Sequence, residues 1–327
     1  MMARKLFPVL LCAAASCFVA CNDANSTQPR PVGLAKSRSE GLERAIVLLI
    51  VNSRSTDAAV RANSIEALQP LQDMRVNDVI EQGLHDREWV VRYAATLAAG
   101  KRQSLKLKPQ IQRMVKDDPN ESVRVACVYA LKRLGDPSHM NTLAEAIRSP
   151  DYRVRANTAF VLGLLGEKSA IGLLEQQTRE VDARVKLEIT AAMARLGDEN
   201  AQNALLAMSL SKLAENRLIA LATAGEVLKP ERANVLSNGL KDPSPLVQLV
   251  AARTLGKMGS PLGHSVAYSY RNDPNPEIRA LSAHALGDML LPSEESPLVR
   301  MLGDPEVSVQ LAAAAGLVNV WSKADKR

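Results

Sequence analysis

The sequence predicts an all-α fold, an α-solenoid of about nine helical-hairpin repeats with a right-handed superhelical course. A Val-Arg pair or a close substitute recurs every 31 residues, with one step of 32. The residues four and eight positions after each Val are small or apolar, and these offsets share one helix face. Aromatic residues make up only 3% of the chain, and strand-like alternation is missing. A period near 30 residues is typical of stacked units that bury a common core. The pairs begin at Val60, Val91, Val123, Val154, Val185, Asn216, Val247, Ile278 and Val309.

The first helix of each unit carries this pair and is apolar nearly all round, as in residues 247–255. We expect it to be buried between its partner helix and both flanking units. In five units an Asp stands five residues before the Val, and we expect it to accept hydrogen bonds from the first turn. Glycine after the helix predicts a left-handed cap. These residues are Asp86, Asp118, Asp242, Asp273 and Asp304, and Gly135, Gly166, Gly197 and Gly259.

The second helix of each unit is more polar and has apolar residues on one side only, as in residues 141–147 and 204–208. This pattern predicts one face in the core and one in solvent. We expect these second helices to carry any binding surface.

The unit from Asp273-Pro274 to Leu286-Gly287 resembles the HEAT repeat, and its short period is similar to the subtype found in phycobilisome-lyase-like proteins. The resemblance covers roughly residues 53–322. The unit at Asn216 lacks the Val, and the first unit lacks the Asp-Pro start. The resemblance implies that the second helices line the concave side of the solenoid and that this side binds partners.

The first 38 residues have a different character. Residues 1–20 are basic and then apolar, as in a secretory signal peptide. The sequence from Phe18 to Cys21 resembles the lipobox of bacterial lipoproteins, which implies lipidation of Cys21. Processing at Cys17 and cleavage without lipidation are alternatives. Residues 21–38 then form a lipidated cysteine and flexible tether, residues 39–52 a capping helix, and residues 53–327 the solenoid.

Charge and cysteine content limit the function classes. The net charge of +6 is mild for 327 residues and requires neither nucleic acid nor acidic substrates. Cys127 lies in the small-residue column of the first helix and is expected to be a buried small side chain. The recurring Arg is expected to bridge neighbouring units by donating to carbonyls and to Asp side chains.

We find no catalytic constellation, metal site or cofactor motif. Each of the four histidines lies in a different unit, and none is followed by the Glu that HEAT-repeat iron hydroxylases carry. The sequence therefore predicts a membrane-tethered scaffold of the cell envelope that binds a protein or an envelope polymer, without nucleic acid. An enzyme of the phycobilin-lyase-like or metal-dependent class is the alternative, and the oligomeric state stays open. The candidate partner-binding residues are Lys106, Lys108, Arg113 and Lys116, and His264, Tyr268, Tyr270 and Arg271.

Overall fold

A computed structural model describes residues 39–177, 179–180 and 182–324, and within these ranges the chain forms α-helices and short 3-10 helices without a strand. The predicted signal peptide, Cys21 and the tether lie outside the described residues. None of the described helices combines the length and apolar character that a membrane crossing requires.

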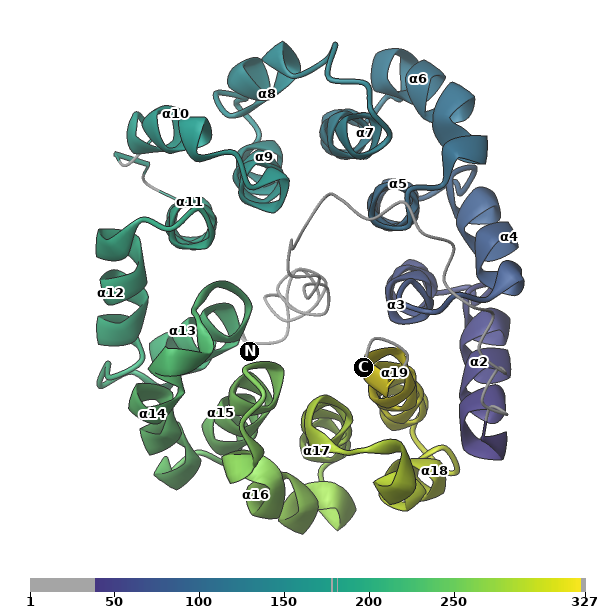
Figure 1. Cartoon of the computed structure of the whole chain (residues 1–327), viewed down its shortest axis with the longest axis vertical. Helices are drawn as coiled ribbons and strands as arrows, with labels where there is room; N and C mark the ends of the chain where they lie inside the picture. Colours follow the sequence, from purple (N-terminus) through teal and green to yellow (C-terminus); the bar gives the residue numbers. More distant parts are fainter. Residues whose placement is uncertain (1–38, 178, 181, 325–327) are drawn as a thin grey trace, which may run out of the picture.

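Alternate helices form two concentric layers (Figure 1). The inner layer consists of α3 (Ala58–Leu68), α5 (Trp89–Lys101), α7 (Glu121–Arg133), α9 (Tyr152–Leu165), α11 (Ala183–Arg195), α13 (Ala214–Val227), α15 (Pro245–Lys257), α17 (Pro276–Met289) and α19 (Val307–Ala324). The outer layer consists of α2 (Glu40–Asn52), α4 (Met74–Gly83), α6 (Lys108–Asp117), α8 (Asn141–Ala146), α10 (Ile171–Glu175), α12 (Glu199–Met208), α14 (Ala233–Leu236), α16 (His264–Ser269) and α18 (Ser296–Met301).

The predicted all-α solenoid is confirmed, but the expected position of the second helices is wrong. The helices with the Val-Arg pair form the inner layer, and the more polar second helices form the outer layer (Figure 1). Inner helices must approach one another closely because they lie on the smaller radius. The first helices carry small residues, such as Gly100, Ala130, Gly287 and Gly316, where neighbouring inner helices meet.

Glycine and alanine set the spacing of the inner layer. A Cβ added to Gly287 on α17 would lie 2.2 Å from Cα of Gly316 on α19. A Cβ on Gly100 of α5 would lie 2.8 Å from Cα of Ala130 on α7. Because both contacts are with backbone atoms, no side-chain rotation could relieve them. The small residues therefore permit the tight curvature of the solenoid.

The solenoid closes into a ring. The last helix, α19, packs against both α2 and α3 at the other end of the chain (Figure 1). Ser39 Oγ donates a hydrogen bond of 2.9 Å to Glu295 Oε2, and Trp321 Nε1 donates one of 2.7 Å to the same oxygen. The segment predicted as a cap, residues 39–52, thus forms an outer helix that joins the two ends. Sequence analysis did not predict this closure.

The role expected for the Asp before each inner helix is wrong in detail. The N-cap of α7 is Asn120, whose side chain accepts from the N–H groups of Ser122 and Val123. Asp118 instead accepts from the N–H of Asn120 itself at 2.9 Å. The Asp118 carboxylate therefore stabilises the turn two residues before the N-cap, and Asp86 does the same by accepting from the N–H of Glu88 at 2.8 Å.

The other local expectations hold. Gly135, Gly166, Gly197 and Gly259 all have positive φ, between 74° and 96°. Cys127 is fully buried and has no disulfide partner. Burial raises the pKa of its thiol.

Candidate functional site

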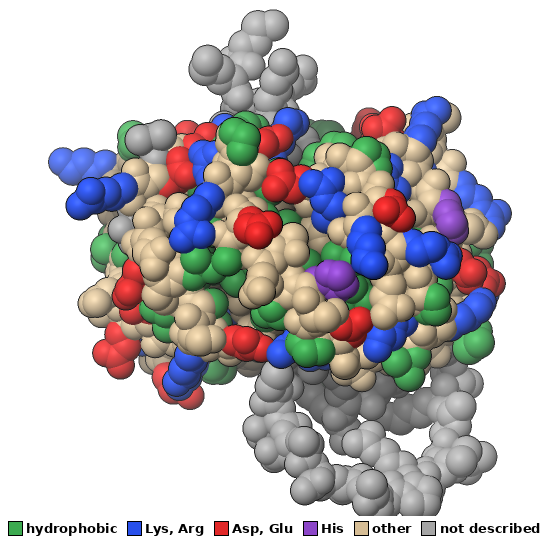
Figure 2. Space-filling model, turned by 90° about the horizontal axis from the view of Figure 1, so that it is seen from above, with side chains coloured by type: hydrophobic (Ala, Val, Ile, Leu, Met, Phe, Trp, Pro, Cys, Tyr) green, Lys and Arg blue, Asp and Glu red, His purple; other side chains and the backbone are tan. Residues whose placement is uncertain are grey.

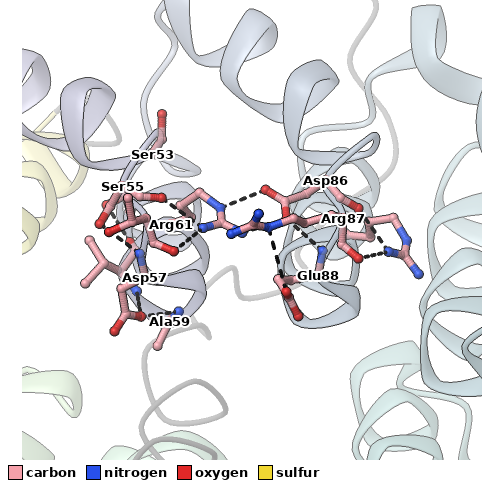
Figure 3. Close-up of polar contacts among 12 residues, drawn as sticks. Ser53, Ser55, Asp57, Ala59, Arg61, Asp86, Arg87 and Glu88 are labelled. Atoms are coloured by element: carbon pink, nitrogen blue, oxygen red, sulfur yellow. Dashed lines mark hydrogen bonds and ion pairs between the residues drawn. The ribbon is translucent and has the colours of Figure 1, made fainter.

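An arginine near the start of the inner helix links neighbouring units at several turns from outer to inner helices, and Figure 3 shows one such contact, between Arg61 and Asp86. Arg61 donates through Nε and Nη2 to the two carboxylate oxygens of Asp86, each at 2.8 Å. Its Nη1 donates to the carbonyls of Ser55 and Thr56 at 2.8 and 3.0 Å. The Arg61 side chain therefore stabilises the turn before its own helix and also binds the carboxylate of the next unit.

The same arrangement, which we call the turn ladder, recurs around the ring. A bidentate or fork-like Arg–carboxylate pair joins successive units at four further turns, in Arg92–Asp118, Arg155–Glu180, Arg217–Asp242 and Arg279–Asp304. Where Gln replaces Arg, the carbonyl contact remains: Gln248 donates to Asp242 O at 2.6 Å and Gln310 to Asp304 O at 2.7 Å. The expected structural role of this column is confirmed.

A second set of charges lies toward the far end of the inner helices α11 to α19. Glu226 Oε2 lies 3.4 Å from Arg195 Nη2, and its Oε1 lies 3.2 Å from Lys257 Nζ. Asp288 Oδ2 lies 3.2 Å from Arg253 Nε, and its Oδ1 lies 3.6 Å from Lys323 Nζ. We call these six residues the inner-arc network. Each carboxylate has two cations, so the network carries excess positive charge.

The inner-arc network interrupts the repeat. Ten residues after the Val position, successive units place Arg195, Glu226, Lys257 and Asp288, so the charge alternates from α11 to α17. In α9 the same position holds Leu164, and no such alternation runs through α3 to α9. The carboxylates are almost fully buried, with side chains 6% exposed. Charges that are removed from water cost free energy unless they are well paired, so this arc is a costly feature that stacking alone does not require.

Two further titratable groups lie in the same sector and have perturbed pKa values. Burial raises the pKa of Glu188 on α11 to about 7, with Arg195 opposing the shift and Glu226 adding to it. Burial and the charge of Arg253 lower the pKa of His284 on α17 to about 3. The histidine is therefore neutral at physiological pH, and the glutamate is divided between its two forms.

Arg195 is the least satisfied member of the inner-arc network. Its Nε and Nη1 are buried without a hydrogen-bond acceptor among the described residues. Its guanidinium carbon lies 5.6 Å from the ring centroid of Phe160, a cation–π distance. Buried donors without acceptors cost free energy, so Arg195 lowers the stability of this sector.

The predicted basic patch lies on the outer side of the ring, over α6 and the 3-10 helix η2 (Leu105–Leu107) that precedes it. Lys106 pairs with Glu81 at 3.0 Å, and Lys108 donates to the carbonyl of Leu134 at 3.2 Å. Arg113 and Lys116 are exposed. The outer layer seen over α10, α8 and α6 shows cations and carboxylates interspersed (Figure 2).

The predicted aromatic patch lies on α16 and the 3-10 helix η7 (Tyr270–Asn272), also in the outer layer. His264 stacks on Tyr268 with ring centroids 6.0 Å apart, and Arg271 covers the same ring at 3.8 Å. Tyr270 donates to Gln248 Oε1 at 3.0 Å, so one residue of the patch supports the turn ladder. The structure places neither patch on the inner layer, and partner binding by either stays a prediction.

The paired helices, their stacking and the turn ladder define a solenoid of helical hairpins closed into a ring. The chain belongs to the HEAT-repeat family, which its residues 45–132, 77–150 and 140–224 match. No curated protein matches the chain.

Solved structures with a similar fold include both binding proteins and enzymes. The complex of CpcE and CpcF of phycocyanin lyase from Nostoc is 19% identical, with a TM-score of 0.44 over 75% of this chain and 98% of that one. Human deoxyhypusine hydroxylase is 17% identical, with a TM-score of 0.36 over 86% and 97%. The karyopherin Kap121p is 14% identical, with a TM-score of 0.36 over 83% and 37%. These likenesses concern the fold alone.

Sequence analysis missed the inner-arc network. Its signal was the alternation of charge from Arg195 to Asp288 at intervals of one repeat, visible once the units are aligned. The search for function on the second helices directed attention away from it.

Proposed function

We propose that this HEAT-repeat protein is a non-catalytic scaffold of the cell envelope, held at a membrane by a lipid on Cys21, that binds a protein or an envelope polymer. The family and the fold support the scaffold, because stacked repeats present extended surfaces to partners. The lipobox-like sequence before Cys21 supports the anchor. Within this proposal, the partner meets the inner-arc network at Lys323, whose side chain is 43% exposed.

The observation that carries the partner surface is the charge balance of the inner-arc network. Four cations face two carboxylates, and Arg195 retains buried donors without acceptors. A carboxylate or another anionic group of the partner would pair with the accessible cation of the network and balance the charge. Lys323, with its side chain 43% exposed, is the most accessible cation of the network.

Cross-linked co-purification of the tethered protein from its native envelope tests the proposal. We expect Lys323→Glu together with Lys257→Gln to weaken partner capture by about tenfold, as for loss of a charged pair at an interface. Matched charge reversals at Lys108 and Arg113, and the pair Tyr268→Ala with Tyr270→Ala, test the two outer patches. Loss of capture in only one of the outer-patch variants would assign partner binding to that outer patch. Unchanged capture in the inner-arc variant and in both outer-patch variants would exclude all three surfaces. Helicity, measured by circular dichroism, must be retained in each variant.

The anchor has a separate test. Labelled fatty acid should be incorporated into the wild-type protein and into Cys17→Ser, but not into Cys21→Ser. Label retained in Cys21→Ser would refute lipidation at this cysteine. Stoichiometric metal or a bound bilin in the purified protein would instead favour an enzyme.

A further inference from the structure

The two edges of the ring are formed by two different kinds of turn. One edge is formed by the turns from outer to inner helices and carries the turn ladder (Figure 3). The other is formed by the turns from inner to outer helices. Because α2 is an outer helix, its N-cap Ser39 lies at this second edge, beside Glu295 of the turn before α18. The described part of the chain therefore starts at this edge, which we call the tether edge.

Of the ten large exposed apolar side chains among the described residues, four lie on the tether edge in successive units around Ser39, and four lie at the opposite edge, namely Val51, Leu210, Leu213 and Val307. The four on the tether edge stand at the turns into α16 and α18 on one side of Ser39, and at those into α4 and α6 on the other. Single exposed apolar residues are ordinary, but a run over successive units marks a surface that meets an apolar partner. The four tether-edge residues and their exposed fractions are Met74 79%, Leu105 69%, Leu262 55% and Leu291 45%.

These turns are neighbours in the ring. Ser39 is bonded to Glu295, and Arg75 at the start of α4 donates to Glu43 of α2 at 2.5 Å. Lys106 beside Leu105 then pairs with Glu81 of α4. The apolar side chains thus follow a continuous arc of the tether edge, centred on Ser39.

We propose that the tether edge rests on the lipid surface, with Met74, Leu105, Leu262 and Leu291 inserted among the headgroups. This inference rests on the proposed lipid anchor at Cys21. The 18 residues from Asn22 to Ser39 span at most about 60 Å when extended, so the tether holds this edge near the bilayer at high effective concentration. Each inserted side chain then adds a favourable apolar transfer.

The opposite edge supplies a matched control. Leu213, the N-cap of α13, is 65% exposed, so its exposure is close to that of Leu105. We would introduce Leu105→Cys or Leu213→Cys into the full lipidated chain and attach a polarity-sensitive fluorophore. The native Cys127 is fully buried and Cys21 carries the lipid, so the introduced thiol is the reactive one.

In vesicles of phosphatidylethanolamine and phosphatidylglycerol, we expect fluorescence at position 105 to rise about threefold over that at position 213, as on transfer from water to the lipid interface. Adding Met74→Asp with Leu291→Asp should abolish the difference while fatty-acid labelling of Cys21 is unchanged. Equal signals at the two positions, or a rise at 213 alone, would overturn the proposal. A rise at 105 that depends on protein density rather than on lipid would assign the edge to a second copy of the chain and also overturn it. Loss of fatty-acid labelling would refute the anchor itself, so the two failures are distinct.

Discussion

The turn ladder and the inner-arc network both join neighbouring inner helices through charged side chains, but one recurs around the ring and the other occupies a single arc. The turn ladder repeats the same Arg fork at each unit that retains the Arg and the carboxylate, as at Arg61–Asp86 and Arg279–Asp304. The inner-arc network changes its residue type from unit to unit. Regular recurrence indicates a role in stacking, whereas departure from the repeat indicates a role particular to that sector.

The two sets also differ in how their charges are balanced. In the turn ladder one cation meets one carboxylate, and the remaining donors reach backbone carbonyls. In the inner-arc network each carboxylate serves two cations. Stacking is therefore satisfied within the turn ladder, while the inner arc keeps capacity for a further anionic group.

Removal of a carboxylate from the inner-arc network should have the largest effect. Asp288→Ala leaves Arg253 buried without its counter-ion, which is expected to lower the free energy of unfolding by about 3–5 kcal/mol in chemical denaturation. Asp288→Asn keeps the shape but not the charge and should be nearly as unstable. An Asn variant as stable as the wild type would contradict the electrostatic explanation.

Removal of an arginine from the turn ladder should have the next largest effect. Arg92→Ala deletes a 12%-exposed side chain and leaves Asp118, 4% exposed, without its partner. We expect a loss of about 1.5–3 kcal/mol in the same measurement. Arg153→Ala is the matched control, because this Arg is 56% exposed beside Asp151 and should cost less than about 0.5 kcal/mol. Equal losses would show that the buried fork is not what stabilises the turn.

The pH dependence of the free energy of unfolding can test the raised pKa of Glu188 in the inner arc. The pKa of Glu188 is raised from 4.5 to about 7, so the folded state holds a proton that the unfolded state releases. Stability due to this group is complete below about pH 4.5 and is lost as the pH rises through 7. Relative to Glu188→Gln, the wild type should therefore lose about 1–3 kcal/mol between pH 4.5 and 8. Parallel pH profiles for the two proteins would exclude the shift.

The smallest effect should come from repairing the turn ladder. In the unit that follows Gln248, Asp273 occupies the position whose carboxylate pairs with the Arg at the other turns. Gln248→Arg should therefore stabilise the fold by about 0.5–1 kcal/mol, after loss of the bond from Tyr270. Gln310→Arg is the control, because the equivalent position of the next unit around the ring is Ser55, which is not a carboxylate. A gain at Gln310 as large as at Gln248 would show that pairing is not the cause.

Sequence reasoning predicted what a single unit determines. The spacing of Val and Arg gave the helix pair, the bridging role of Arg61 and the burial of Cys127, because these depend on neighbours at one-repeat distance. It could not predict the closure, which sums a small rotation over all units and depends on backbone contacts such as that of Gly287 with Gly316. It also placed the second helices on the wrong side, because the resemblance to HEAT repeats does not determine which layer has the smaller radius in this chain.

Closure by Ser39, Glu295 and Trp321 has a consequence for how the molecule unfolds. In an open array the terminal repeats lack one neighbour and fray first. In the closed ring each repeat has a neighbour on both sides, so local unfolding of any one repeat must break its interfaces with both neighbours. We therefore expect a single cooperative transition in hydrogen exchange and denaturation, with no stepwise loss from either end of the chain.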